Sequence, residues 1–360
     1  MSATPASPPV SDIAKESAKE MGLRYMVDTR PGFSREAKGK GFVYFDKDHK
    51  RITDPAIIER IQSIGIPPAY TDVWISPFAN GHIQATGRDA KGRKQYRYHT
   101  KWRDTRDENK FDHILRFAAL LPEIRKQVAI HLKQPGLSRE KVLACVVSLM
   151  EKTLIRIGNA EYARANNSYG LTTLRRKHID VTGSTIRFSF TGKSGKEWDL
   201  SVNDRRIAGI VSKCADIPGY ELFKYLDESG QKKDVTSGDV NAYLKEITQQ
   251  DITAKDFRTW SGTVLAALAL SEFEKYDSEA QAKRNVVQAI DHVAKQLGNT
   301  RAICRKCYIH PQVLDSYMTG DLAKMVDQQI DRKIKQDYDQ LSEEEIMVLA
   351  FLKKRLKAIN

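Results

Sequence analysis

The sequence predicts an α+β protein in which a small strand-rich N-terminal domain precedes a larger, mainly α-helical domain that contains a β-hairpin. Short alternating segments separated by Pro, Gly and Asn fill roughly the first hundred residues, and apolar residues at helical spacing dominate from about residue 107. The 360 residues suffice for two ordinary domains. We expect a disordered tail at residues 1–18, an N-terminal domain at 19–104 and a second domain at 105–360.

Local patterns predict the elements of the first domain. The aromatic and β-branched segment 41–45 predicts a strand, and Asp54 followed by Pro55 predicts the start of a helix over 55–64. Three further short strands are expected at 73–76, 83–86 and 95–99.

The second domain shows helix signals around one hairpin. Ser138 is expected to cap a helix that runs to residue 154. Two alternating segments, 186–190 and 197–202, flank the turn TGKSGK and predict a β-hairpin. The remaining predicted elements are an apolar core helix over 259–275 and a final helix that begins with a capping box of Ser342 and Glu345.

The charge balance narrows the class of partner. Lys and Arg total 59 against 46 Asp and Glu, a formal net charge of +13. This excess favours nucleic acid first and an anionic membrane surface second, although a basic protein without such a partner has the same composition. No apolar run approaches the ~20 residues of a membrane helix, and the polar N-terminus lacks the apolar core of a secretory signal. We therefore expect no membrane partner.

No motif of metal or nucleotide chemistry appears. The sequence contains no P-loop, HExxH or Rossmann glycine run. Cys304 and Cys307 form a CxxC, but Cys145 and Cys214 lie far from it, so zinc has weak support and reduced cytosolic thiols are expected. We expect neither a metal nor a cofactor.

The segment 87–106 combines cations with aromatic residues, which suits contact with phosphates, sugars and base edges. Strand alternation places Arg93 and Arg97 on one face and Lys94, Tyr96 and Tyr98 on the other. One face is expected to contact DNA, and the pattern does not decide which. A solvated basic strand whose tyrosines enter the core is the alternative.

Two arginines lie in apolar surroundings. Arg156 stands among apolar neighbours at a helix end, where a buried guanidinium needs a partner. An internal pair with a glutamate and a phosphate clamp are both open. Arg258 is expected to open the apolar helix, either as part of a structural cap or near an anion bound at the helix N-terminus.

Lys193 and Tyr308 have ordinary and chemical interpretations. Lys193 lies in the hairpin turn, where it is either solvated or able to donate a proton to a leaving oxygen if neighbouring arginines lower its pKa. Tyr308 is either a packing residue or a nucleophile favoured by Arg305 and Lys306, which precede it.

The order of these segments resembles the type IB DNA topoisomerases of bacteria and poxviruses, over roughly residues 20–320. The carriers of the resemblance are PGFSREAKGKGFVY (31–44), GRKQYRYH (92–99), LIRIGNAEYARANNSYGLTTL (154–174), FTGKSGKEWDL (190–200), KDFRTWSGT (255–263), LGNT (297–300) and SYMTG with the upstream CYIHP (307–311).

The resemblance implies an enzyme that relaxes supercoiled duplex DNA without ATP or metal, by transient cleavage and religation of one strand. Tyr308 would form the 3′-phosphotyrosyl link, and Lys193 would protonate the leaving 5′-oxygen. Arg156 and Arg258 would stabilise the transition state, with Asn299 standing where poxvirus and eukaryotic members carry histidine. Asparagine carries no charge, so we expect its contribution to be smaller.

The resemblance also implies how the domains are used. The second domain would have a tyrosine-recombinase-like fold, and the first would form a clamp on duplex DNA. Tyr162 would be a further DNA contact. The protein would act as a monomer, in the cytoplasm and associated with the nucleoid.

Two other functions share parts of this pattern. A tyrosine site-specific recombinase has the same Arg–Lys–Arg–Tyr constellation, but usually carries His-x-x-Arg where this chain has KDFR, and usually has a helical N-terminal domain. A non-catalytic DNA-binding protein is the second alternative, although every core position is occupied here. Both are placed below a topoisomerase.

Overall fold

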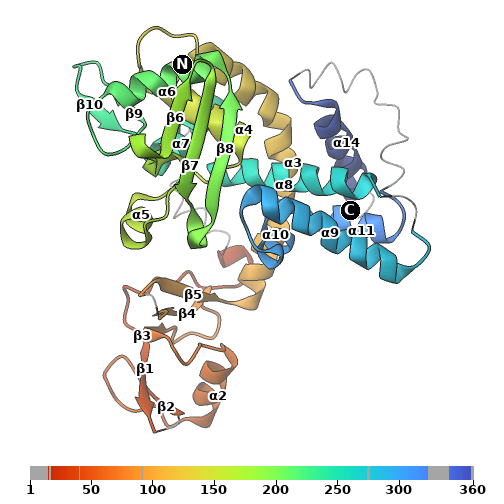
Figure 1. Cartoon of the computed structure of the whole chain (residues 1–360). Coiled ribbons are helices and arrows are strands. Elements are labelled where there is room, and N and C mark those ends of the chain that lie inside the picture. Colours follow the sequence, from red (N-terminus) through yellow and green to blue (C-terminus); the bar gives the residue numbers. More distant parts are fainter. Residues whose placement is uncertain are drawn as a thin grey trace, which may run out of the picture. The chain divides into compact units, whose positions relative to one another are not determined.

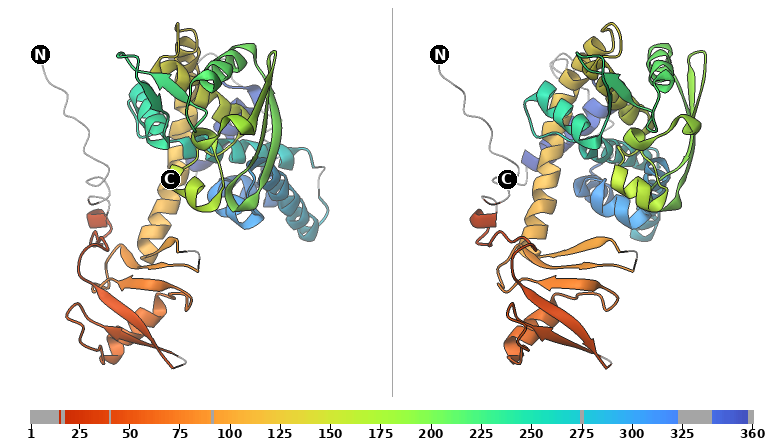
Figure 2. Two further views of the ribbon diagram at one scale, coloured as in Figure 1. Left: turned by 60° about the vertical axis from the view of Figure 1, so that its left-hand side comes forward. Right: turned by 90° about the vertical axis from the view of Figure 1, so that its left-hand side faces the viewer.

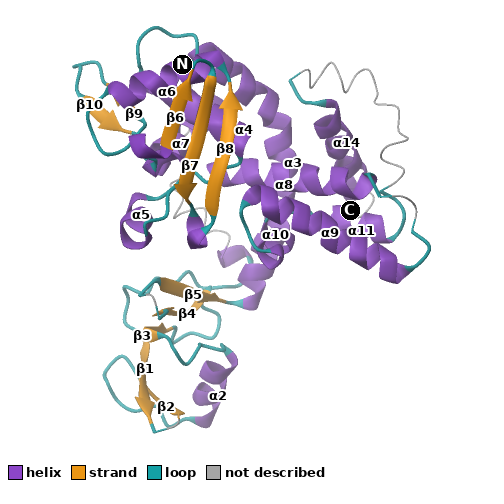
Figure 3. Cartoon of the chain, viewed as in Figure 1, coloured by secondary structure: helices purple, strands orange, loops and turns teal. Residues whose placement is uncertain are grey.

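The structure, a computed structural model, describes residues 15, 18–39, 41–90, 92–273, 276–322 and 340–357, with the side chains of residues 104–112 and 357 left out. The chain divides into two compact units, residues 1–110 and 111–360. The first unit is rich in strands and the second is mainly helical, which confirms the α+β class (Figure 3). Apart from Lys15 and Ala18, the tail expected at residues 1–18 lies outside the described residues.

The first unit is a five-stranded antiparallel sheet with one helix against it. The strand order is β2-β1-β3-β4-β5. The strands are β1 (Phe33–Lys38), β2 (Gly41–Phe45), β3 (Thr71–Ile75), β4 (Ile83–Arg88) and β5 (Lys94–Tyr98). The predicted strands and helix are confirmed to within a few residues, whereas β1, whose sequence FSREAK is polar, was not predicted.

Helix α2 (Pro55–Ser63) begins as its sequence predicts. The Asp54 side chain accepts a hydrogen bond from the Ala56 amide at 2.9 Å, and Pro55 occupies the first turn, where its missing N–H costs nothing. Its Ile61 packs into a small core with Val73 and Ile75 of β3. This core holds α2 on the sheet.

The second unit is a helical assembly with a three-stranded antiparallel sheet in the order β6-β7-β8. The long helices are α3 (Thr100–His131, which begins in the first unit), α4 (Arg139–Thr153), α6 (Arg205–Asp216), α7 (Ser237–Thr248), α8 (Ala254–Ser271), α9 (Glu279–Leu297) and α14 (Glu343–Lys357). The shorter elements are α5 (Ala160–Asn166), α10 (Arg301–Cys307), α11 (Pro311–Met318), β6 (Ile179–Thr182), β7 (Thr185–Thr191), β8 (Glu197–Asn203), β9 (Lys224–Leu226), β10 (Lys232–Asp234) and the 3₁₀ turns η1 (Leu171–Thr173), η2 (Arg176–His178) and η3 (Lys193–Gly195).

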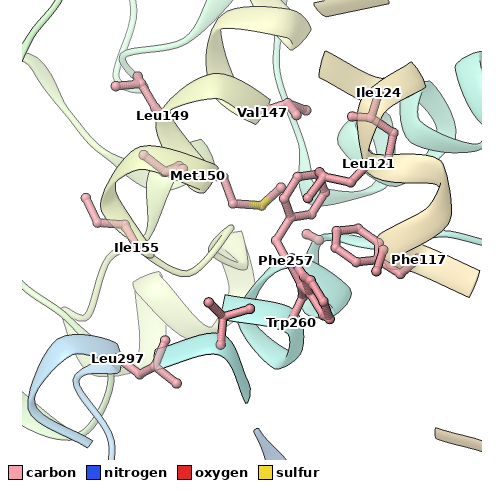
Figure 4. Close-up of a cluster of buried hydrophobic side chains, with 14 of the residues drawn as sticks. Phe117, Leu121, Ile124, Val147, Leu149, Met150, Ile155, Phe257, Trp260 and Leu297 are labelled. Carbon is pink, nitrogen blue, oxygen red and sulfur yellow. The ribbon is translucent and has the colours of Figure 1, made fainter. Parts of the chain in front are cut away.

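Helix α8 lies at the centre of the core of this unit. Its Phe257 and Trp260 are buried, and Phe257 meets Phe117 of α3 edge to face at 4.9 Å between ring centres (Figure 4). Met150 of α4 lies in the same cluster. This packing fixes α8 between α3 and α4, so side chains on α8 have defined positions.

The start of α8 corrects the predicted helix over 259–275. The helix begins at Ala254, because Asp256 accepts hydrogen bonds from the amide and hydroxyl of Thr253, at 2.8 and 2.9 Å, in a capping box. Arg258 therefore lies in the second turn and does not open the helix. The prediction missed this start because the polar Lys255 and Asp256 hide the helical period.

The C-terminal helix α14 is joined to the core through its capping residue. Ser342 and Glu345 form the predicted capping box. The Glu345 carboxylate also accepts from the indole of Trp260 at 3.0 Å and pairs with Arg125 of α3 at 2.8 Å. Arg125 pairs in turn with Glu151 of α4 at 2.6 Å. Helix α14 therefore braces α3, α4 and α8.

Candidate active site

The predicted catalytic residues come from five segments of the second unit. The turn of the β7–β8 hairpin, the short helix α5 and helix α10 gather at one end of this unit (Figures 1 and 2). Arg156 follows α4, Arg258 lies in α8, and Asn299 and Tyr308 flank α10.

The backbone around Arg156 is tightly held. Helix α4 ends at Leu154 in a left-handed conformation with φ of 57°. The Arg156 carbonyl then accepts from the Leu171 amide at 2.9 Å. A side chain at Gly170 would bring a Cβ to 2.5 Å from that carbonyl oxygen, so only glycine permits this approach. The backbone of Arg156 is thereby fixed against η1.

The Arg156 guanidinium bonds to neutral acceptors. Its Nη2 donates to the Gly298 carbonyl at 3.2 Å and to Oδ1 of Asn299. These partners are not glutamates, so the predicted alternative of an internal Arg156–glutamate pair is wrong. Burial lowers the pKa of Arg156, yet a guanidinium remains charged at neutral pH.

Arg258 is held by the ends of two helices. Its Nη1 donates to the carbonyl of Leu154, and its Nη2 donates to the carbonyl of Leu297 at 2.7 Å. These carbonyls lie at the C-termini of α4 and α9, where the helix dipole carries partial negative charge. Burial, followed by repulsion from Arg156, lowers the pKa of Arg258. The partial negative charges of these two carbonyls do not cancel the full charge of the guanidinium, so a net positive charge remains at Arg258.

One donor of Arg258 has no partner in the part of the chain that the structure describes. Its Nε is buried and makes no hydrogen bond there. The guanidinium carbon lies 5.1 Å from the centre of the Tyr308 ring. The buried guanidinium of Arg258 and the half-buried one of Arg156 have neutral partners, so together they make a site that favours an anion.

Asn299 carries a second donor of this kind. Its Oδ1 accepts from Arg156, which fixes the orientation of the amide and leaves Nδ2 as the remaining donor. That Nδ2 is buried and has no hydrogen-bond partner among the described residues. Asn299 follows Gly298, whose φ of 57° ends α9. The site thus contains an amide donor fixed beside the two arginines.

Tyr308 is placed by α8 as well as by its own helix. Its amide donates to the Cys304 carbonyl at 3.0 Å at the end of α10. A Cβ on Gly262 would lie 2.6 Å from the Tyr308 carbonyl oxygen, so α8 and the Tyr308 backbone touch. The neighbouring Thr263 hydroxyl lies 3.3 Å from the same oxygen and accepts from the His310 amide at 3.1 Å.

Sequence reasoning missed Gly262 and Thr263. The available signal was a glycine inside an otherwise apolar helix, which often marks a close approach of another backbone. The structure also changes which cation accompanies Tyr308. The prediction relied on Arg305 and Lys306, whereas the guanidinium that lies against its ring is that of Arg258.

Lys193 is exposed at the hairpin turn. The turn is tightened by Ser194 and Gly195 in left-handed conformations, with φ of 64° and 74°. The Lys193 Nζ lies 6.0 Å from the centre of the Tyr162 ring on α5. The structure thus brings together two predicted residues that lie in different segments.

The predicted DNA-contact strand β5 exposes its aromatic face. Tyr96 and Tyr98 are each 44% exposed and stack with 5.9 Å between ring centres, so the alternative in which they enter the core is wrong. Lys94 pairs with Asp28 at 2.5 Å. Although burial opposes it, this pairing lowers the pKa of Asp28.

The other face of β5 is less open. Arg93 pairs with Asp89 at 2.7 Å. Arg97 is half-buried, and its Nε has no hydrogen-bond partner among the described residues. The exposed surface of this strand is therefore mainly aromatic, with Lys94 at its edge.

Both units match known protein families. Residues 99–337 match the family described as eukaryotic DNA topoisomerase I, catalytic core. Residues 41–89 match the family described as bacterial DNA topoisomerase IB, N-terminal domain. The chain belongs to the type IB DNA topoisomerases. The family assignment sets aside the recombinase and the non-catalytic DNA-binding protein.

Viral relatives agree with this type IB topoisomerase over most of their length. The DNA topoisomerase 1B of Acanthamoeba polyphaga mimivirus is 34% identical over 297 residues, which are 80% of this chain and 88% of the viral protein. The DNA topoisomerase 1B of Vaccinia virus (strain Copenhagen) is 23% identical over 287 residues, 75% of this chain and 88% of that protein. The DNA topoisomerase 1 of Rabbit fibroma virus is 24% identical over 305 residues, 78% and 90%.

The buried thiols of this topoisomerase are poor nucleophiles at neutral pH, because burial raises their pKa. Burial raises the pKa of Cys304 to about 11 despite Arg258 and Arg156 nearby. The four cysteines are free. Among the described residues, no three His, Cys, Asp or Glu side chains form a possible metal site, and no helix is long and apolar enough to cross a membrane.

Proposed function

We propose that this topoisomerase relaxes supercoiled duplex DNA with Tyr308 as nucleophile and with Arg156, Arg258 and Asn299 around the scissile phosphate. The observation that carries the proposal is the buried Arg258 guanidinium against the Tyr308 ring, together with the half-buried Arg156 guanidinium; both are held by neutral acceptors. Such a site is costly when empty and is stabilised by an anion. A phosphodiester supplies the anion.

The reaction exchanges one phosphodiester for another. The Tyr308 oxygen attacks the phosphorus, the bond to the 5′-oxygen breaks, and a 3′-phosphotyrosyl link forms. Lys193 donates its proton to the departing 5′-oxygen, and the phenol proton passes to water. The free 5′-hydroxyl strand rotates about the intact strand and attacks the link in reverse. Because bond energy is conserved, neither ATP nor a metal is required.

The charge that develops on the non-bridging oxygens is met by fixed donors. Arg156 and Arg258 supply charged N–H groups, and the unpartnered Nδ2 of Asn299 supplies a neutral one. Each such donor contributes on the order of 10²–10³ in rate. Asn299 also holds Arg156 through Oδ1, so its role includes orientation as well as donation.

DNA binding is assigned to both units. We propose that residues 19–104 form a DNA-clamp domain whose β5 residues Arg93, Lys94, Tyr96, Arg97 and Tyr98 contact DNA. The exposed tyrosine pair supports an aromatic contact with sugars or bases. We propose that residues 105–360 form a tyrosine-recombinase-like catalytic domain in which Tyr162 contacts the strand near Lys193. We expect a monomer acting on the nucleoid in the cytoplasm.

The test is supercoil relaxation without ATP or Mg²⁺, combined with trapping of the covalent adduct. Tyr308→Phe should abolish both relaxation and adduct while leaving DNA affinity unchanged, because only the attacking oxygen is removed. Tyr220→Phe, the same change at a tyrosine that is 80% exposed, is the matched control and should keep both activities. Adducts that persist in Tyr308→Phe would show that another residue is the nucleophile.

A further inference from the structure

Trp198 is a buried side chain that connects two parts of the site. It lies on β8, five residues after Lys193, and is 9% exposed. A Cβ on Gly192 would lie 2.6 Å from its Nε1, and a Cβ on Gly298 would lie 2.8 Å from its Cζ2. The indole therefore fills the space between the hairpin turn and the loop that joins α9 to α10.

Each glycine precedes a proposed catalytic residue. Gly192 is followed by Lys193, and Gly298 is followed by Asn299. The Gly298 carbonyl is also an acceptor for Arg156. The indole thus touches the backbone beside the proposed proton donor and the backbone beside the proposed transition-state donors.

The indole is itself fixed. Phe190 of β7 stacks on it with 6.1 Å between ring centres and an interplanar angle of 4°. The turn closes under it through the Gly192 amide, which donates to the Lys196 carbonyl at 2.7 Å. Lys193, by contrast, is exposed, so the position of its backbone depends on the turn that carries it.

We propose that Trp198 is a positioning residue for Lys193: it holds the hairpin turn at a fixed distance from the Asn299 loop. The ammonium then reaches the leaving 5′-oxygen while Arg156 and Asn299 hold the non-bridging oxygens of the same phosphate. Trp198 contacts neither DNA nor the reacting atoms in this scheme. The proposal rests on the general-acid role proposed above for Lys193.

The effect is measurable because proton donation depends on position. General acid catalysis contributes about 10²–10⁴ in rate, and a misplacement of about 1 Å can cost 10² of it. A defect in positioning should therefore appear as lost proton donation, whereas a general loss of packing should slow every substrate.

The experiment compares two leaving atoms in single-turnover cleavage of a duplex oligonucleotide. In one substrate the scissile bond joins phosphorus to the 5′-oxygen, and in the other it joins phosphorus to a 5′-sulfur. A thiolate leaves without receiving a proton, so the sulfur substrate bypasses the general acid. Lys193→Ala provides the reference for complete loss of the acid.

Two variants displace or shrink the indole. Trp198→Phe removes the Nε1 edge over Gly192, and Gly192→Ala inserts a Cβ against that edge while keeping the indole. The matched control is Gly209→Ala in α6, where a Cβ meets nothing within 4 Å. We expect both variants to cleave the oxygen substrate about tenfold to a hundredfold more slowly and the sulfur substrate at nearly the wild-type rate. The control should match wild type on both substrates.

The outcomes separate the two proposals. If Lys193→Ala is not rescued by sulfur, the general-acid role itself is wrong. If Lys193→Ala is rescued but the two indole variants are equally slow on both substrates, Trp198 is only structural and the positioning role is overturned. Wild-type rates in both variants overturn it too. A thermal unfolding scan identifies a Trp198→Phe protein that does not fold, in which case Gly192→Ala decides.

Discussion

Replacing Gly262 by alanine should separate activity from stability in this enzyme. The new Cβ would lie 2.6 Å from the Tyr308 carbonyl oxygen and 3.1 Å from its Cβ. Ordinary contact begins at 3.4 Å, so α8 and the Tyr308 backbone must part by about 0.8 Å. A shift of that size at the proposed nucleophile should cost on the order of 10- to 100-fold in cleavage rate.

The same change favours the helix. Alanine is about 0.8–1 kcal/mol better than glycine in a helix interior. Overpacking typically costs about 1–3 kcal/mol and offsets this gain, so we expect the free energy of unfolding to fall by no more than about 2 kcal/mol. DNA affinity should be unchanged, because Gly262 lies beneath Tyr308 on a buried stretch of α8.

The assay is the rate of covalent adduct formation in a single turnover at saturating protein, alongside thermal unfolding and a filter-binding isotherm. Gly209→Ala is the control, since it makes the same exchange within a helix but meets nothing within 4 Å. A wild-type cleavage rate in Gly262→Ala would refute the reasoning, because it would mean that Tyr308 does not depend on this contact. Slower cleavage in Gly209→Ala would also refute the reasoning, because a glycine-to-alanine change without a steric contact would then have the same effect.

Three further predictions follow from single contacts. Asn299→Ala should slow cleavage by about 10²-fold, because it removes the Nδ2 donor. Asn299→Asp should be slower still, because a carboxylate repels the phosphate. Equal single-turnover cleavage rates for these two variants would contradict this. His178 accepts from the Arg175 amide through Nδ1, and burial lowers its pKa from 6.5 to about 4. The unfolded chain therefore binds the proton first, so the free energy of unfolding should fall by about 2–4 kcal/mol as the pH drops from 6.5 to 4; His178→Gln should flatten this slope in denaturant titrations. Glu345→Ala should cost about 2–4 kcal/mol of stability by removing the partner of Arg125 and the acceptor of Trp260; an unchanged denaturation midpoint would count against α14 as a brace.

Local patterns were sufficient for much of the fold. Asp54 and Ser138 cap helices where the sequence predicts, because a cap is a bond between residues two or three apart. The hairpin is likewise read from its own alternation. The start of helix α8 was predicted wrongly, because the polar residues Lys255 and Asp256 interrupt the apolar spacing. Asp256 forms the capping bond at the true start of the helix.

The sequence by itself determined the class, the family resemblance, the identity of the five proposed catalytic residues and the charge that favours DNA. Only the tertiary structure decided which of their groups face one another. The bond between Arg156 and Asn299 joins residues 143 positions apart, and that between Arg258 and Leu154 spans 104. The contacts of Trp198 with Gly298 and of Gly262 with Tyr308 likewise join distant segments. Such contacts depend on how separate helices pack, and no local period or spacing records that packing.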